Sequence, residues 1–472
     1  MALPDLIEIV PLAKPVRAEI TVPGSKSITN RALILAALAD GETILQGALW
    51  SEDTQIMVEC LQELGFMVNV EPDPAEPCNR TITVYGNGGA VPPGATETQP
   101  LDLFVGNAGT AARFLAPFLC LGSGVYRLHG VPRMHERPQA ALFQALRELG
   151  YRIESEKGND KLPVKIFGNE KLKVKNAKCR VSIEESSQFA SALLLSSGIG
   201  NWKIEIVGEN AEESPYVAMT SKLIEALPKN GGTFQIEPDA SSGSYFWIID
   251  LLGPCAEGRD LHFVRVAHWP TSGWQMDEPF PDYLIFGNRA REARELKRKN
   301  ALTDELSRKL IKEATTTISR KTDLGDSIMT AIVWSAQDEA RICLNNEKKF
   351  RFVDLGRLRV QECERVVALH RELEICGAEI IEEGDTLTVW PSPLHGAEIE
   401  TYNDHRMAMC FAILGLKVPG IKIKNPACVK KTFPNFFQKL AAQPPHGLGA
   451  EIWEIKDGRR TRKLSGDDLF AE

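Results

Sequence analysis

The chain has 472 residues, of which 43% are hydrophobic and 25% are charged. A chain of this length is too long for one ordinary hydrophobic core, and this composition excludes a disordered protein, so we expect two large globular domains. The formal net charge of −8 excludes a general electrostatic attraction for nucleic acid, and any anion must therefore be bound by local clusters of cations.

The ten cysteines are scattered singly, without a Cys-x-x-Cys pair, and no two histidines have metal-ligand spacing. This pattern disfavours a disulfide scaffold and a metal site. No apolar run reaches membrane-spanning length, and Met1–Glu8 lacks the basic residues of a signal segment. We therefore expect a cytoplasmic protein that does not bind membranes.

The first polar motif is Pro23–Arg31, Pro-Gly-Ser-Lys-Ser-Ile-Thr-Asn-Arg, which directly precedes the apolar run Ala32–Ala39. Its hydroxyls and two cations lie at the start of a predicted helix, where the helix dipole favours an anion. The phosphate loop of nucleotide hydrolases is excluded, because it requires glycine before the lysine and here Ser25 precedes Lys26. A structural alternative, a Pro-Gly turn followed by a capped helix, explains this segment equally well.

A helix-like segment, a glycine and an alternating strand-like segment recur along the chain. The pattern surrounds Gly65 and Gly150 and, in looser form, Gly231 and Gly377. The last interval is nearly twice the others, as though one copy were obscured. The recurrence predicts repeated α/β units, although any α/β protein contains several such joints.

Three further polar motifs lie in the first half. Val105–Arg113 contains two glycines that permit close backbone approach before an apolar helix. Pro132–Pro138 holds two arginines in a short loop, which suits a carboxylate or phosphate. Glu185–Gln188 sets two hydroxyls and an amide before a third helix. Caps and surface arginines explain each motif alone. Together with Pro23–Arg31, however, Val105–Arg113 and Glu185–Gln188 make three helix starts of one chemical type, which favours an anion site.

In the second half, Asp326 precedes an apolar helix, where a capping role is the default. The spacing of Arg359, Glu362 and Arg365 predicts one helical face, with a surface ladder of ion pairs as the alternative. Two more polar motifs are Asn403–Arg406 and Lys430–Lys431.

Between these motifs lies a polar segment, near 286–320, that predicts an exposed helical insertion. Its basic run, Arg289–Lys299, suggests nucleic-acid binding, but a solvated helix face is favoured because the run has no aromatic residue. Beyond Gln443 the composition predicts a linker and a short appended strand or a disordered tail.

Taken in order, these motifs resemble those of the 5-enolpyruvylshikimate-3-phosphate synthase family. The similarity extends from Ile9 to Ala442, apart from Trp247–Arg320. Asn-Ala-Gly-Thr-Ala, Ser-Ser-Gln and Tyr-Asn-Asp-His-Arg argue against the related UDP-N-acetylglucosamine enzymes. The segments that carry the resemblance are Pro23–Arg31, Gly106–Arg113, Pro132–Pro138, Ser186–Gln188, Asp326–Thr330, Arg359–Arg365, Thr401–Met409 and Lys431–Pro434.

The resemblance implies a transferase that joins the enolpyruvyl group of phosphoenolpyruvate to the 5-hydroxyl of shikimate 3-phosphate and releases phosphate, in aromatic amino-acid biosynthesis. It implies two small-molecule substrates, no nucleic acid and no membrane. No metal or other cofactor is implied, since arginine and lysine can stabilise phosphate charge. We also expect a monomer. A non-catalytic binding or regulatory protein on the same scaffold is the alternative.

The resemblance also implies roles for individual residues. Asp326 would be the base that takes the proton from the attacking hydroxyl, and Glu362 with Lys431 would protonate the methylene carbon, with Lys26 as a further catalytic residue. Phosphoenolpyruvate would be held by Lys26, Asn107, Gly109, Arg137, Gln188, Arg365, Arg406 and Lys431. Shikimate 3-phosphate would be held by Lys26, Ser27, Arg31, Ser186, Ser187, Gln188, Asp326 and Gln361.

The fold implied is α/β, with two enolpyruvyltransferase-like domains, each of three repeated α/β units around buried helices. One domain would comprise residues 25–238. The other would combine residues 1–24 with 239–442, including the charged insertion, and residues 443–472 would form an appended tail. Since both domains supply anion-binding loops, closure of the domains would assemble the site.

Three positions depart from the family pattern. Glu213 stands where a serine usually contacts the substrate phosphate, so either Ser214 replaces it or Glu213 points away. Gln361 stands where many relatives have lysine, and Phe114 replaces a common proline. Gly109 leaves room for the inhibitor glyphosate, which we expect to compete with phosphoenolpyruvate. The replacement of the common proline by Phe114 argues against this competition.

Overall fold

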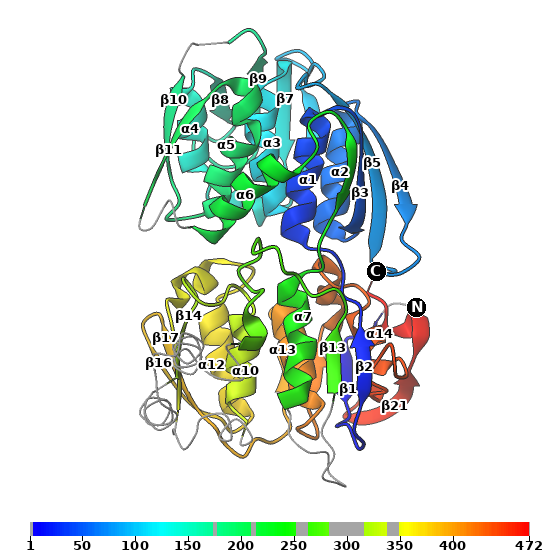
Figure 1. Cartoon of the computed structure of the whole chain (residues 1–472). Helices are drawn as coiled ribbons and strands as arrows, with labels where there is room; N and C mark the ends of the chain where they lie inside the picture. Colours follow the sequence, from blue (N-terminus) through cyan, green and yellow to red (C-terminus); the bar gives the residue numbers. More distant parts are fainter. Residues whose placement is uncertain are drawn as a thin grey trace, which may run out of the picture. The chain divides into compact units, whose positions relative to one another are not determined.

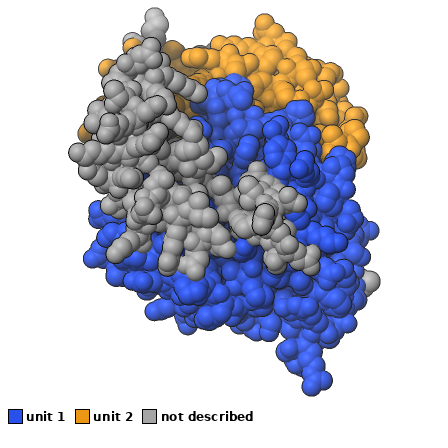
Figure 2. All heavy atoms as spheres, turned by 60° about the horizontal axis from the view of Figure 1, so that its bottom comes forward, with its two compact units in different colours: residues 1–22, 238–472 blue, residues 23–237 orange. Residues whose placement is uncertain are grey.

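The computed structural model describes residues 3–172, 177–208, 214–251, 263–282, 316–337 and 349–471. The chain divides into two compact units, which Figure 2 colours separately. Unit 1 combines residues 1–22 with 238–472, and unit 2 comprises residues 23–237. Helices and strands alternate in both units, as Figure 1 shows, so the predicted α/β class is confirmed.

The described part of unit 2 forms three sheets around a group of helices. Its strands are β3 (Asp40–Leu49), β4 (Met67–Pro72), β5 (Asn79–Asn87), β6 (Leu101–Phe104), β7 (Ser123–His129), β8 (Arg152–Ser155), β9 (Val164–Asn169), β10 (Lys178–Ser182), β11 (Lys203–Val207) and β12 (Gly232–Gln235). Its helices are α1 (Lys26–Leu38), α2 (Glu52–Glu63), α3 (Gly109–Cys120), α4 (Ala140–Glu148), α5 (Ser187–Gly200) and α6 (Pro215–Ala226). The sheet orders are β12-β3-β5-β4, β6-β7-β9-β8 and β10-β11.

Within its described residues, unit 1 also has three sheets, in the orders β14-β15-β17-β16, β18-β19-β1-β20-β21 and β13-β2. Its strands are β1 (Leu6–Ile9), β2 (Arg17–Ile20), β13 (Phe263–Val266), β14 (Thr316–Ser319), β15 (Phe350–Val353), β16 (Glu379–Glu383), β17 (Thr386–Trp390), β18 (Glu398–Ile399), β19 (Lys422–Lys424), β20 (Ile452–Lys456) and β21 (Arg459–Leu464). Its described α-helices are α7 (Ala240–Trp247), α10 (Ile328–Ser335), α12 (Arg365–Ile375), α13 (His405–Gly415) and α14 (Phe436–Ala441), and its described 3₁₀ helices include η3 at Leu355–Val360.

The three four-stranded sheets share one topology. In each, the first two strands are parallel and the other two neighbouring pairs are antiparallel. The fourth strand follows a helix through a glycine with a positive φ, 98° at Gly65, 97° at Gly150 and 89° at Gly377. These joints confirm the repeat predicted there. Gly231 instead leads into β12, a first strand, so that joint does not belong to the same position of the repeat.

The central helices explain why polar residues gather at helix starts. Every residue of α3 and of α10 is buried. An apolar helix of this kind packs on all sides and can carry charge only at its ends. Figure 1 shows α1, α3 and α5 running between the strands of unit 2.

Several sequence predictions fall outside the described residues. The obscured repeat copy and the charged insertion lie largely in 283–315, the basic run Arg289–Lys299 lies wholly there, and Glu213 lies in 209–213. The predicted tail, in contrast, is described: β20 and β21 extend the sheet of β1 within unit 1. In the part of the chain that the structure describes, no helix combines the length and apolar character needed to cross a membrane.

Candidate functional site

The start of α1 presents Lys26. Among the described residues, the side chain of Ser25 makes no capping hydrogen bond, so the capped-helix alternative does not account for this motif. The Nζ of Lys26 donates to Oδ2 of Asp53 on α2 at 3.1 Å. Ser27 follows Lys26 and is half-buried. The sequence did not predict a role for Asp53, because an acidic residue in the first turn of a helix usually only complements the helix dipole.

Arg31 is a buried cation with neutral partners. It is 2% exposed, and its guanidinium donates to the Thr220 hydroxyl at 2.8 Å, the Ser191 hydroxyl at 3.1 Å and the Ser27 carbonyl at 2.8 Å. Burial lowers the pKa of Arg31 to about 10. The guanidinium carbon lies 5.1 Å from the ring centroid of Phe114 on α3.

These contacts align three helices. Arg31, Phe114 and Ser191 lie at nearly the same depth from the starts of α1, α3 and α5. Since Arg31 contacts both other residues, the N-terminal ends of the three helices lie at one end of the bundle. Their partial positive charges therefore add to those of the nearby side chains.

The start of α3 is shaped by Arg137. A Cβ on Gly109 would lie 2.7 Å from both terminal nitrogens of Arg137, so only glycine permits this approach. The same guanidinium donates to the Asn107 carbonyl at 3.3 Å. The buried Oδ1 of Asn107 has no hydrogen-bond partner within the described ranges. The structure thus brings together three residues that the resemblance assigned to phosphoenolpyruvate.

The start of α5 is joined to α3 by Gln188. Its amide nitrogen donates to the Thr110 hydroxyl at 3.4 Å, and its amide oxygen accepts from Arg113 at 2.5 Å. Ser186 caps the helix by accepting from the backbone N–H of Gln188, and Ser187 is buried. Arg113 was noted as a charge but not predicted as a site residue, and its guanidinium fixes the predicted Gln188.

In unit 1, Asp326 precedes α10 and receives three guanidinium groups. Arg320 donates to Oδ1 at 2.8 Å, while Arg406 and Arg365 lie 3.1 and 3.6 Å from Oδ2. Burial alone would raise the pKa of Asp326. The charges of Arg406, Arg320 and Arg365 outweigh burial and hold this pKa well below its ordinary value.

Arg365 is the centre of this group and is 1% exposed at the start of α12. It contacts Asp404 at 2.7 Å and Glu362 at 2.9 Å, and it donates to the side-chain oxygen of Gln361. Burial would lower the pKa of Arg365, but the carboxylates of Asp404, Glu362 and Asp326 raise it.

The predicted residue Lys431 completes this group, which we call the unit 1 cluster: Arg320, Asp326, Glu362, Arg365, Asp404, Arg406 and Lys431. Lys431 lies 3.2 Å from Glu362. Asp404 caps α13 by accepting from the backbone N–H of Arg406 at 2.9 Å. The cluster therefore forms where α10, α12 and α13 begin.

The helical face predicted for Arg359, Glu362 and Arg365 is wrong. The 3₁₀ helix that contains Arg359 ends at Val360, and α12 begins only at Arg365. Arg359 forms ion pairs with three carboxylates, those of Glu364, Glu382 and Asp385. The alternative of surface ion pairs thus applies to Arg359, whereas Arg365 is buried among the charged residues around Asp326.

Asp277 belongs to the segment without family resemblance and binds the turn that carries Asp326. Asp277 is 4% exposed and accepts from Gly325 N–H at 2.6 Å, from both the hydroxyl and the N–H of Ser327, and from the Ser241 hydroxyl. Gln275 accepts from the backbone N–H of Ala240, the first residue of α7. Sequence reasoning missed Asp277, because nothing local connects it to the turn that carries Asp326.

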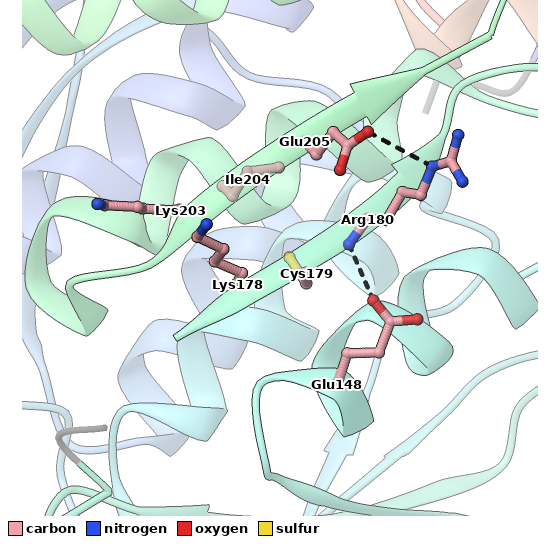
Figure 3. A pocket seen from close by; sticks show the side chains of 7 residues that line it. All are labelled: Glu148, Lys178, Cys179, Arg180, Lys203, Ile204 and Glu205. Atoms are coloured by element: carbon pink, nitrogen blue, oxygen red, sulfur yellow. Dashed lines mark hydrogen bonds and ion pairs between the residues drawn. The ribbon is translucent and has the colours of Figure 1, made fainter. Parts of the chain in front are cut away.

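Unit 2 also has an open pocket between α4 and the strands β10 and β11 (Figure 3). Its charges are mixed: Arg180 lies 3.7 Å from Glu205, and its backbone N–H donates to Glu148 at 2.9 Å. Lys178 and Lys203 are paired in the register of the two strands. None of its lining residues belongs to the predicted site.

The sequence of the chain is similar to those of known enzymes. A family model described as EPSP synthase (3-phosphoshikimate 1-carboxyvinyltransferase) matches residues 11–231 and 291–440. The match leaves out 232–290 but resumes at 291, earlier than the sequence resemblance suggested. A 3-phosphoshikimate 1-carboxyvinyltransferase of Opitutus terrae is 36% identical over 469 residues, covering 93% of this chain and 98% of the relative. The protein of that name from Trichormus variabilis is 34% identical, with coverages of 92% and 98%.

Solved structures agree in fold. EPSP synthase from Acinetobacter baumannii aligns with a TM-score of 0.65 at 21% identity, covering 96% of this chain and all of that one. The enolpyruvyl transferase NikO from Streptomyces tendae aligns with a TM-score of 0.60 at 14% identity, with coverages of 95% and 98%. The predicted two-domain enolpyruvyltransferase-like fold is therefore confirmed.

Proposed function

The chain belongs to the EPSP synthase family, and on that premise we propose that it transfers the enolpyruvyl group of phosphoenolpyruvate to the 5-hydroxyl of shikimate 3-phosphate and releases phosphate. The observation that carries the proposal is the unit 1 cluster, where Arg320, Arg365 and Arg406 surround the single carboxylate of Asp326. Both substrates carry a carboxylate and a phosphate, and such anions are met by arginine and lysine.

Phosphoenolpyruvate is assigned residues of both units. In unit 1 these are Arg365, Arg406 and Lys431, whose guanidinium and ammonium groups contact carboxylates of the cluster. In unit 2 the buried Oδ1 of Asn107 and the guanidinium of Arg137 at Gly109 support the assignment. Lys26 and Gln188 complete the set.

Shikimate 3-phosphate is assigned the starts of α1 and α5, with Lys26, Ser27, Arg31, Ser186, Ser187 and Gln188, together with Asp326 and Gln361 of unit 1. Arg31 supports this assignment because its described hydrogen-bond acceptors are neutral, so its charge is not cancelled by a carboxylate at hydrogen-bond distance. Gln361 is the weakest member, since its side-chain oxygen already accepts from Arg365.

For the chemistry, Asp326 takes the proton of the 5-hydroxyl as that oxygen attacks C2 of phosphoenolpyruvate. Glu362 and Lys431, 3.2 Å apart, deliver a proton to the methylene carbon. The tetrahedral intermediate then loses a proton and phosphate to give the enolpyruvyl ether. General acid–base catalysis of this kind contributes about 10²–10⁴-fold. The alternative of a non-catalytic protein finds no support in the family match or in these residues.

The test is phosphate release by the purified protein with both substrates. We expect release that requires both substrates, and a loss of about 100-fold or more in Asp326→Ala and in Lys26→Ala. The matched control is Asp385→Asn, which changes an exposed carboxylate paired with Arg359. Full activity in both site variants would refute the assignment. Glyphosate should compete with phosphoenolpyruvate in the same assay.

We further propose a monomer that works in the cytoplasm. Light scattering of the purified protein tests the first statement, and fractionation of the source cells tests the second.

A further inference from the structure

Arg320 stands out because none of the sequence motifs that carry the resemblance includes it. It follows β14 and is 7% exposed. One terminal nitrogen donates to Oδ1 of Asp326 at 2.8 Å. Its Nε is buried, and no residue in the described ranges accepts a hydrogen bond from it. A buried arginine with an unused donor is costly unless another molecule supplies the acceptor.

The two oxygens of Asp326 have different neighbours. Oδ2 meets Arg406 and Arg365, both of which are assigned to phosphoenolpyruvate. Oδ1 meets Arg320. Arg320 therefore adds a cation at the carboxylate oxygen that the phosphoenolpyruvate arginines do not occupy.

The charges of the cluster leave room for a bound anion. Arg320, Arg365, Arg406 and Lys431 face three carboxylates, those of Asp326, Glu362 and Asp404. Arg320 and Arg406 share Asp326, whereas Arg365 contacts all three carboxylates. Among the seven residues of the unit 1 cluster, cations outnumber carboxylates by four to three, and Arg320 has a buried Nε–H that no described residue accepts.

We propose that Arg320 binds the acceptor substrate, by keeping Asp326 on one nitrogen and donating its Nε–H to an oxygen of shikimate 3-phosphate. The inference rests on the proposed function, in which Asp326 takes a proton from that molecule. Because a terminal nitrogen of Arg320 is held 2.8 Å from Oδ1 of this base, the guanidinium lies beside the place where the attacking hydroxyl must approach Asp326. The sequence resemblance did not reveal this residue, because Arg320 lies in none of the motifs that carry it.

The test measures binding of shikimate 3-phosphate to the full-length protein by calorimetry, without phosphoenolpyruvate, and steady-state kinetics for both substrates. In Arg320→Gln we expect binding weakened by about tenfold or more, because a charge-assisted hydrogen bond is lost. The KM for phosphoenolpyruvate should change much less. Arg320→Lys keeps the charge without the planar fork and should weaken binding to an intermediate degree.

Arg359→Gln is the matched control, because Arg359 also pairs with carboxylates of unit 1 but lies outside the cluster. Unchanged binding of shikimate 3-phosphate in Arg320→Gln, with only kcat reduced, would overturn the inference and leave Arg320 as a partner of Asp326. If Arg320→Gln does not fold, Arg320→Lys decides by the same measurement. Failure of the wild-type protein to bind shikimate 3-phosphate would overturn the proposed function and the inference together.

Discussion

A side chain at Gly109 would crowd Arg137, because a Cβ there would lie 2.7 Å from the terminal nitrogens of its guanidinium. In Gly109→Ala the flexible end of Arg137 must move. We expect a several-fold rise in the KM for phosphoenolpyruvate and little change in Tm. Gly198→Ala is the control, since a Cβ at that exposed helical position meets no described atom within 4 Å. An unchanged KM in Gly109→Ala would show that Arg137 does not hold this substrate.

Asp326 also makes stability depend on pH. Since its pKa is lowered in the folded protein, its contribution is present above the ordinary carboxyl pKa of about 3.9 and is lost as the pH falls toward the lower folded value. Asp326→Asn should cost about 3 kcal/mol at pH 7, because it leaves buried guanidinium groups without this partner. The difference from wild type should shrink below about pH 4.

Thermal unfolding of both proteins between neutral and acidic pH measures this dependence. The exposed Asp385→Asn should cost no more than about 1 kcal/mol at any pH, as is usual for surface ion pairs. A difference between wild type and Asp326→Asn that stays constant down to low pH would show that Asp326 is not held by the arginines.

At the scale of elements, Asp277 connects three segments that are distant in sequence. It accepts from the turn Gly325–Ser327, which carries Asp326, and from Ser241 on α7. Asp277→Ala leaves these buried donors without an acceptor, at about 1–3 kcal/mol for each group. We therefore expect a lower Tm and a lower kcat, because Asp326 is no longer fixed.

Asp277→Asn keeps an acceptor oxygen and should restore part of both properties. Burial raises the pKa of Asp277. Replacing this carboxylate with a neutral amide should therefore cost less than the same replacement in an ion pair. Equal kcat values for Asp277→Ala and wild type would contradict a role of Asp277 in positioning Asp326.

The elements show what sequence could and could not predict. The starts of α1, α3 and α5 were predictable, because each joins a polar motif directly to an apolar run. Asp277 and Arg320 were not, because their roles arise from contacts with Asp326 and its turn that only the folded chain reveals. The break between Val360 and Arg365 was missed because helical spacing alone does not reveal where one helix ends.

At the scale of the whole molecule, the last residues belong to the core of unit 1. Ile452, Leu464 and Leu469 are almost wholly buried, and burial of such a side chain contributes about 1.5–3 kcal/mol. Removing residues 444–472 should therefore destabilise unit 1 and expose the edge of β1. We expect aggregation and a large fall in Tm, measured by light scattering and calorimetry.

Arg459→Thr, on the exposed face of β21, is the control and should leave both measurements unchanged. A truncated protein with the wild-type Tm would show that the tail is dispensable. Composition alone suggested a linker with a strand or disorder here, because pairing with β1, more than 400 residues away, leaves no local signal.

The position of β1 between β19 and β20 has a consequence for biosynthesis. The residues of unit 2 are contiguous, so on the ribosome that unit can fold as soon as Glu237 has emerged. The first strand of the chain, in contrast, must wait for both of its partners, which are translated last. Until then its apolar side chains remain exposed, and chaperones acting on nascent chains should bind this N-terminal segment throughout elongation.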